Sequence, residues 1–160
     1  MEINVDTGKI LEKNYEILVL GIFEEEKYQG VNGIIDKALG KEISQKLKTS
    51  EFNPKLKKTC LITTYGKIGI KRILLVGLGK RKDFSPESIG MASSSAINSI
   101  QELGITSCTF SILGDNAKIL VEQIVENTVV GCELALYQFN LYKTEDRNIK
   151  KINKLLFFVD

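Results

Sequence analysis

The sequence has 160 residues, a length that fits one domain. Its 22 Lys and Arg residues and 20 Asp and Glu residues leave a net charge of only +2, so the composition carries no electrostatic signature of a partner such as nucleic acid or an acidic membrane. The chain contains no histidine, which excludes Ser-His and Cys-His nucleophiles and every imidazole metal ligand.

The sequence also gives no sign of a membrane segment or of secretion. Its apolar runs are far shorter than the ~20 residues of a membrane helix. The N-terminal segment 1–10 is polar, so we expect neither a signal peptide nor a transit peptide. Cys60, Cys108 and Cys132 are widely spaced, and each lies in an apolar segment. This odd set indicates buried thiols rather than a disulfide framework, and it predicts a cytoplasmic protein.

The first predicted element is a strand over 15–24. Its continuous apolar run is typical of a strand that is buried on both faces. One helix is predicted next, because apolar residues recur at helical spacing over 34–47. Asn32 is its expected N-cap, and its expected end is near Lys48.

Two further strands are predicted over 59–65 and 72–79. The segment 66–71 between them contains two glycines, which suit a reversing turn. We therefore expect an antiparallel hairpin. Within its second strand, Gly77 is expected to allow another segment to pack closely, and Gly79 to turn the chain.

A helix is predicted to follow, with Ser85 as its N-cap and Pro86 at its first position, where the missing N–H costs nothing. Its apolar stripe runs over 89–103, and Gly104 occupies the place of a left-handed residue after the helix. Another strand is predicted over 107–113.

The longest predicted helix begins at Asp115 or Asn116 and continues to Phe139 with a regular apolar stripe. Gly131 interrupts this stripe, and we expect it to allow a close approach to the sheet. A last strand is predicted over 155–160. Strands that alternate with helices in this way predict a three-layer α/β/α domain with a mixed, mostly parallel sheet.

The turn after the strand 72–79 matches neither common nucleotide-binding pattern. The dinucleotide motif requires a third glycine after Gly77 and Gly79, but this chain has Lys82 at that position. The phosphate-loop motif fails as well, since Gly79-Lys80 is not followed by Ser or Thr. A helix that begins near Ser85 beside Lys80 can still attract an anion. Gly77, Gly79, Lys80 and Ser85 are therefore the candidate anion-binding residues.

Three groups of residues that could suggest a reactive centre have simpler interpretations. Glu24–Glu26 are consecutive carboxylates at a strand end, typical of a solvated charge cluster rather than of a metal site. Ser93–Ser95 lie within a predicted helix, where small residues favour close packing. The cysteines have no cationic neighbours that would activate a thiol. We therefore predict no catalytic residue and no metal ligand in this chain.

Two longer segments carry a resemblance to a known family. The first is 72–105, in which Val76-Gly77-Leu78-Gly79-Lys80 precedes a helix rich in small residues. The second is 129–146, which contains Tyr-Gln-Phe-Asn-Leu-Tyr-Lys-Thr. Both resemble the amino-terminal domain of cytosolic leucine aminopeptidases. In that family, the sequence that corresponds to the second segment is Tyr-Arg-Phe-Asp-x-Tyr-Lys-Thr. Gln138 and Asn140 depart from that motif, and Val130-Gly131-Cys132 replaces the Glu-Gly-Ala of the family.

The resemblance implies a macro-domain-like fold, with 1–160 as a single non-catalytic amino-terminal domain. It also implies a parent enzyme that removes N-terminal residues from peptides with two divalent metal ions, Zn or Mn. These ions are bound by a second domain, whose Asn-Thr-Asp-Ala-Glu-Gly-Arg motif has no match in this sequence. The implied partners are this catalytic domain of the same polypeptide and further copies in a hexamer. No cofactor is implied for the chain itself.

The alternative is a stand-alone macro-like module that binds ADP-ribose or a related nucleotide. In open α/β sheets, ligands bind outside the carboxyl ends of the strands. The loops after Phe23 and after Gly79 are the expected walls of such a site. A structural domain and a ligand-binding module thus remain the two hypotheses.

Overall fold

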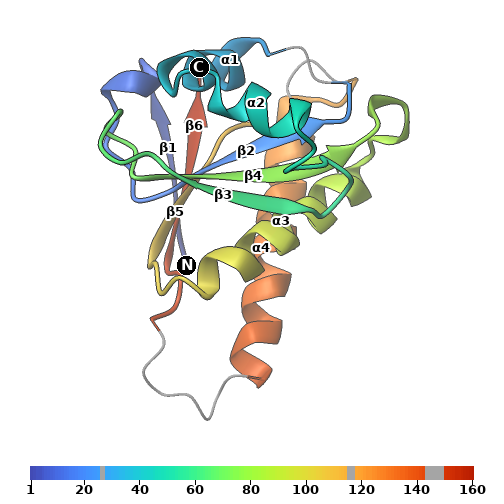
Figure 1. The fold of residues 1–160 in the computed structure, drawn as a ribbon. Helices are drawn as coiled ribbons and strands as arrows, with labels where there is room; N and C mark the ends of the chain where they lie inside the picture. Colours follow the sequence, from blue (N-terminus) through green and yellow to red (C-terminus); the bar gives the residue numbers. More distant parts are fainter. Residues whose placement is uncertain (26–27, 115–117, 143–149) are drawn as a thin grey trace.

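The chain forms a six-stranded sheet in the order β1-β6-β5-β2-β4-β3, as seen in a computed structural model that describes residues 1–25, 28–114, 118–142 and 150–160 (Figure 1). Neighbouring strands are parallel except for β3, which is antiparallel to β4 at one edge. The strands are β1 (Glu2–Thr7), β2 (Leu18–Phe23), β3 (Thr59–Thr63), β4 (Arg72–Gly79), β5 (Ser107–Phe110) and β6 (Lys154–Val159). The α-helices are α1 (Gly30–Ala38), α2 (Glu42–Lys48), α3 (Pro86–Gln101) and α4 (Val121–Tyr142).

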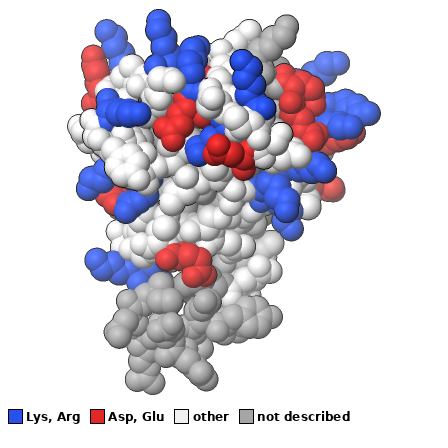
Figure 2. Space-filling view, in the orientation of Figure 1, with Lys and Arg blue, Asp and Glu red and all other residues white. Residues whose placement is uncertain are grey.

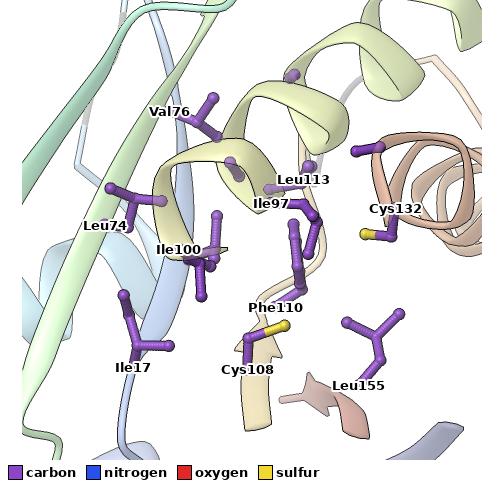
Figure 3. Close-up of a cluster of buried hydrophobic side chains, with 14 of the residues drawn as sticks. Ile17, Leu74, Val76, Ile97, Ile100, Cys108, Phe110, Leu113, Cys132 and Leu155 are labelled. Carbon is purple, nitrogen blue, oxygen red and sulfur yellow. The ribbon is translucent and has the colours of Figure 1, made fainter. Parts of the chain in front are cut away.

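Helices cover both faces of the sheet, which confirms the predicted three-layer α/β/α architecture. Alternate residues of β2 belong to two separate hydrophobic clusters, as the two-residue period of a strand requires. Val19 packs into the cluster that contains residues of α3 and α4, whereas Leu18 and Leu20 pack into the cluster under α1 and α2. Figure 3 shows part of the first cluster, where Cys108 and Cys132 lie among aliphatic side chains.

The predicted hairpin and the predicted start of α3 are confirmed. Strand β3 pairs with β4 in the antiparallel sense. At the start of α3, the Ser88 N–H donates to Ser85 Oγ and the Ser85 N–H donates to Ser88 Oγ, both at 3.2 Å. These reciprocal bonds satisfy two backbone donors of the first turn. After α3, Gly104 has a φ of +69°, the left-handed conformation expected there.

The prediction of a single helix over 34–47 is wrong, because this part of the chain forms two helices, α1 and α2. Gly40 and Lys41 both adopt left-handed backbone conformations, with φ of +67° and +68°. The buried Asp36 side chain of α1 then accepts hydrogen bonds from the Ser44 N–H, at 3.1 Å, and from the Ser44 hydroxyl. A carboxylate near a helix N-terminus is favourable. The break is therefore stabilised by a contact between residues eight positions apart.

The structure also differs from the prediction at the start of α1, at β1 and at the start of α4. Helix α1 begins at Gly30 with Gln29 as its N-cap, so Asn32 is not the cap. The strand β1 was not predicted, because its alternation of polar and apolar residues is short and it lies at an exposed edge. Helix α4 begins at Val121, after three non-helical residues, 118–120. The predicted starts, Asp115 and Asn116, lie outside the described residues.

Gly131 faces a helix and not the sheet, which corrects the expectation for this position. A Cβ atom added at Gly131 would lie 2.4 Å from the carbonyl oxygen of Gly90 in α3. The Ser94 hydroxyl, one turn further along α3, donates a hydrogen bond to the Gly131 carbonyl oxygen at 2.8 Å. The glycine therefore sets the distance between α3 and α4.

The side chain of Gln101, in the last turn of α3, is fully buried, and neither of its amide polar atoms has a hydrogen-bond partner among the described residues. A buried polar group without a partner costs about 1–3 kcal/mol. We expect Gln101→Met to raise the free energy of unfolding by about 1 kcal/mol, because methionine has a similar shape and no group to satisfy. Urea unfolding measures the change. Gln123→Met, at an exposed position of α4, is the matched control and should have little effect; a destabilised Gln101→Met protein would contradict the prediction.

Candidate functional site

One pocket among the described residues lies at the carboxyl ends of the parallel strands β2, β5 and β6. Its volume is about 350 Å³. Phe23 ends β2, Ser111 and Ile112 follow β5, and Phe158 lies near the end of β6, and all four line the pocket. This is the place where open α/β sheets bind ligands. We call this feature the strand-end pocket.

One wall of the strand-end pocket is made by the loops that follow β2 and β4. The guanidinium carbon of Arg81 lies 4.3 Å from the centre of the Phe23 ring, a cation–π geometry. The Arg81 N–H donates to Glu25 Oε2 at 2.9 Å, and the Glu24 N–H donates to the Gly79 carbonyl oxygen at 2.9 Å. These bonds join the two loops, which the sequence predicted as walls of a site.

The first turn of α1 also lines the pocket. Gly30, Val31 and Asn32 line the pocket, and the Asn32 side-chain amide donates to the Gly21 carbonyl oxygen at 3.0 Å. This bond, and not N-capping, is the role of Asn32. The N-cap residue Gln29 makes no side-chain hydrogen bond to the first turn. The start of α1, with its partial positive charge, thus lies at the pocket.

Aromatic rings close the side of the pocket nearest Gly114. Gly114 has a φ of +77°, and a Cβ atom added there would lie 2.5 Å from atoms of the Phe84 ring. The rings of Phe84 and Phe23 contact each other edge to face, with centroids 4.9 Å apart. Aromatic carbon therefore packs against Gly114 on the side where a side chain would project.

Charges of both signs line the strand-end pocket. Its ionisable side chains among the described residues are Glu25, Arg81 and Asp160. Over the face displayed in Figure 2, positive and negative side chains are likewise interspersed. A ligand with both charges, or with none, fits such a lining better than a polyanion does.

The four candidate anion-binding residues of the sequence do not line this pocket. Gly77 packs against backbone, since a Cβ atom there would lie 2.0 Å from the Lys55 carbonyl oxygen. Gly79 has a φ of +74° and donates its N–H to the Pro54 carbonyl oxygen. Lys80 is exposed, and Ser85 caps α3. The close packing and the turn expected of the two glycines are confirmed, whereas anion binding at these residues stays a prediction.

The remaining groups that could do chemistry have structural roles in the described residues. Burial raises the pKa of the Cys108 thiol to about 12 and the pKa of the Cys132 thiol well above its ordinary value. The half-buried Cys60 thiol also has a raised pKa because of burial. The hydroxyls of Ser93, Ser94 and Ser95 all donate to backbone carbonyl oxygens. These thiols and hydroxyls are therefore not poised as nucleophiles.

The carboxylates do not assemble a metal site within the described residues, where no group of three or more Asp, Glu or Cys side chains is placed to hold an ion. Of the cluster Glu24–Glu26, Glu25 binds the Arg81 N–H and Glu26 lies outside the described residues. The residues present thus do not fit the two-metal centre implied by the resemblance. No helix in the described ranges combines the length and the apolarity that a membrane-spanning segment needs.

Solved structures match this fold closely. A mutant of tomato leucine aminopeptidase superposes with a TM-score of 0.77 at 16% identity, covering 99% of this chain and 32% of the enzyme. A Trypanosoma brucei macrodomain in complex with ADP-ribose superposes with a TM-score of 0.72 at 15% identity, covering 99% of this chain and 64% of the other. At these identities the comparison shows the fold alone, and it confirms the macro-domain-like architecture.

Sequence comparison shows the family. The N-terminal domain of the cytosol aminopeptidase family matches residues 19–146. A probable cytosol aminopeptidase of Geobacter sp. (strain M21) is 32% identical over 147 residues, which are 92% of this chain and 29% of the relative. One of Alkaliphilus metalliredigens is 30% identical over 145 residues, which are 90% and 29% of the two chains. The chain thus spans about 29% of the length of these relatives, and it belongs to the cytosol aminopeptidase family, corresponding to its N-terminal domain.

Proposed function

We propose that this chain is the non-catalytic, architectural domain of a leucine-aminopeptidase-like two-metal exopeptidase. Its role is to shape the oligomer and the approach to a catalytic domain of the same polypeptide. The observation that carries the proposal is the family match, which falls on the N-terminal domain of proteins about three times as long as this chain. Metal-dependent hydrolysis is assigned to the part of those proteins that this chain does not cover.

An exposed apolar surface supports an architectural role. On α4, Val130, Leu134 and Tyr137 are 57%, 53% and 66% exposed, and their spacing places them on one side of the helix. Ile3 and Val5 of the edge strand β1 are exposed too. Met1, next to β1, and Tyr137 of α4 line one groove. Contiguous exposed apolar side chains are typical of contacts with other protein parts.

A hydrolysis assay tests the proposal. The purified chain with Mn²⁺ or Zn²⁺ is expected to leave leucine p-nitroanilide intact, because its described residues offer no cluster of carboxylates to hold the ions. A full-length cytosol aminopeptidase, assayed under the same conditions, is the positive control. Turnover by this chain that a chelator abolishes would overturn the proposal.

The alternative, a stand-alone module for ADP-ribose or a related nucleotide, ranks second. The loops expected to form its walls contribute Glu25 and Arg81 to the strand-end pocket. However, a diphosphate there would meet the carboxylates of Glu25 and Asp160. Micromolar binding of ADP-ribose in a calorimetric titration would favour this alternative.

A further inference from the structure

We infer that the strand-end pocket is covered by the polypeptide segment that directly follows Asp160 and connects this domain to the catalytic domain. The inference rests on the proposed function, because that function places a catalytic domain in the same polypeptide. The match to the N-terminal domain of relatives about three times as long supports this order of the two domains. The structure adds where the connecting segment starts and which surface it covers.

The chain leaves its last strand within the lining of the strand-end pocket. Asp160 follows β6 directly, is exposed and lines the pocket. Phe158, two positions earlier, lines the pocket too and packs in the cluster under α1 and α2. The first turn of α1 contributes Gly30 and Val31 to the same lining. A segment that continues from Asp160 therefore starts beside the first turn of α1.

Chain geometry keeps the first residues of this segment at the pocket. Each residue extends the chain by at most about 3.6 Å, so two residues after Asp160 reach no further than about 7 Å. The pocket is small, with a volume of about 350 Å³. A stretch of a few residues is therefore long enough to cover it.

The lining suits a peptide segment better than it suits a charged ligand. Val31 and Ile112 are half-buried apolar side chains of the lining, and covering them is favourable by about 25 cal/mol per Å² of apolar surface. Glu25 and Asp160 add carboxylates to this lining. A peptide backbone has no net charge, so these carboxylates do not repel it as they would repel a polyanion.

The groove beside α4 is too far away to receive the start of the segment. Met1 and residues 151–153, which line that groove, lie at the amino ends of β1 and β6. The six residues of β6 span about 20 Å between this end of the sheet and Asp160. Figure 1 accordingly shows the two termini at opposite ends of the sheet. At least about six further residues are needed to return to the groove, so the strand-end pocket is the surface that the segment meets first.

Thiol modification measures whether the segment covers the pocket. Gln29 is exposed, lines the pocket and makes no side-chain hydrogen bond as the N-cap of α1, so Gln29→Cys places a reactive thiol in the lining. Ile34→Cys, at an exposed position of the same helix outside the lining, is the matched control. Both variants also carry Cys60→Ser, because the other two cysteines, Cys108 and Cys132, are fully buried.

Each variant is prepared as the 160-residue chain and as a chain extended by about 20 of the residues that follow Asp160 in the gene product, a length ample to cross the pocket. We expect Ellman's reagent to modify the Gln29→Cys thiol about tenfold more slowly in the extended chain, since thiol reactivity requires exposure. The Ile34→Cys thiol should react equally fast in both chains.

Equal rates for the Gln29→Cys thiol in the two chains would overturn the inference. Protection that appears only in the complete polypeptide would also overturn it, because the cover would then be the catalytic domain and not the connecting segment. Both of these results leave the proposed function standing. A gene product that ends at Asp160 removes the proposed function and the inference together, so the two failures are distinguishable.

Amide resonances of the unaltered chain give a second test that does not depend on the folding of a variant. On extension beyond Asp160, the resonances of Gly30 and Gly114 should shift, because both residues line the pocket. The resonance of Gly66, in the turn between β3 and β4, should keep its position. Unshifted Gly30 and Gly114 resonances would contradict the inference.

Discussion

Replacing Gly77 by alanine is expected to lower the free energy of unfolding by about 3–4 kcal/mol. The new Cβ atom would lie 2.0 Å from the Lys55 carbonyl oxygen and 2.6 Å from the Pro54 carbonyl carbon. These are backbone atoms, so no side-chain rotation relieves the overlap. The neighbouring chain is also held by two hydrogen bonds, from the Gly77 N–H to the Lys58 carbonyl oxygen and from the Lys57 N–H to the Gly77 carbonyl oxygen.

Thermal unfolding measures this loss, which should lower the Tm by about 10 °C for a chain of this size. Gly66→Ala is the control. Gly66 has a φ of +76° but no atom within 4 Å of an added Cβ atom, so it isolates the conformational cost, about 1 kcal/mol. Equal losses in the two variants would show that close packing on Gly77 does not matter.

Gly77 and Gly79 also show why the sequence pattern alone could not decide whether the segment after β4 binds a ligand or only packs in the fold. A glycine that lets a backbone pass at van der Waals distance is needed both in a phosphate-binding turn and in a packed fold. At Gly77 the close neighbour is the protein's own chain at Pro54 and Lys55. These residues are more than 20 positions away in the sequence, so the sequence pattern alone could not identify them.

The elements that sequence reasoning predicted correctly are those with local signals. The apolar run of β2 is buried on both faces, and Ser85 with Pro86 begins α3 as expected. The break between α1 and α2 was missed. Gly40 gave a signal for it, but the left-handed conformation of Lys41 and the capping of α2 by Asp36 depend on contacts across the turn.

The sequence predicted the location of the candidate site, but it did not predict most of the residues that line it. The general rule for parallel strands indicated the loops after Phe23 and Gly79, and the structure brings Glu25 and Arg81 of these loops together. No sequence motif marks the hydrogen bond from the Arg81 N–H to Glu25 or the stacking of Arg81 on Phe23. Asp160 was missed as well, because its position in the pocket follows from β6 lying beside β5, which is a matter of strand order.

Replacing Gly131 by alanine is expected to destabilise the fold by about 2 kcal/mol, although alanine is the better helix former. The Cβ atom would lie 2.4 Å from the Gly90 carbonyl oxygen and 2.9 Å from the Gly90 Cα atom. To relieve this overlap, α4 must move away from α3. The movement would stretch the hydrogen bond of the Ser94 hydroxyl to the Gly131 carbonyl oxygen and loosen the packing of Cys132 and Ala135.

Gly90→Ala, on the other side of the same helix crossing, is the matched control and should act in the opposite direction. A Cβ atom at Gly90 would have Asn127 O as its nearest neighbour, at 3.8 Å, which is an ordinary contact. The substitution should therefore stabilise the chain by about 0.5–1 kcal/mol through helix propensity alone. Urea unfolding of the two variants compares them directly. Because both sites are helical glycines, helix propensity alone predicts that both substitutions stabilise the chain. Only the close contact at Gly131 predicts that Gly131→Ala lowers the free energy of unfolding while Gly90→Ala raises it. Stabilisation of both variants would contradict the close contact at Gly131.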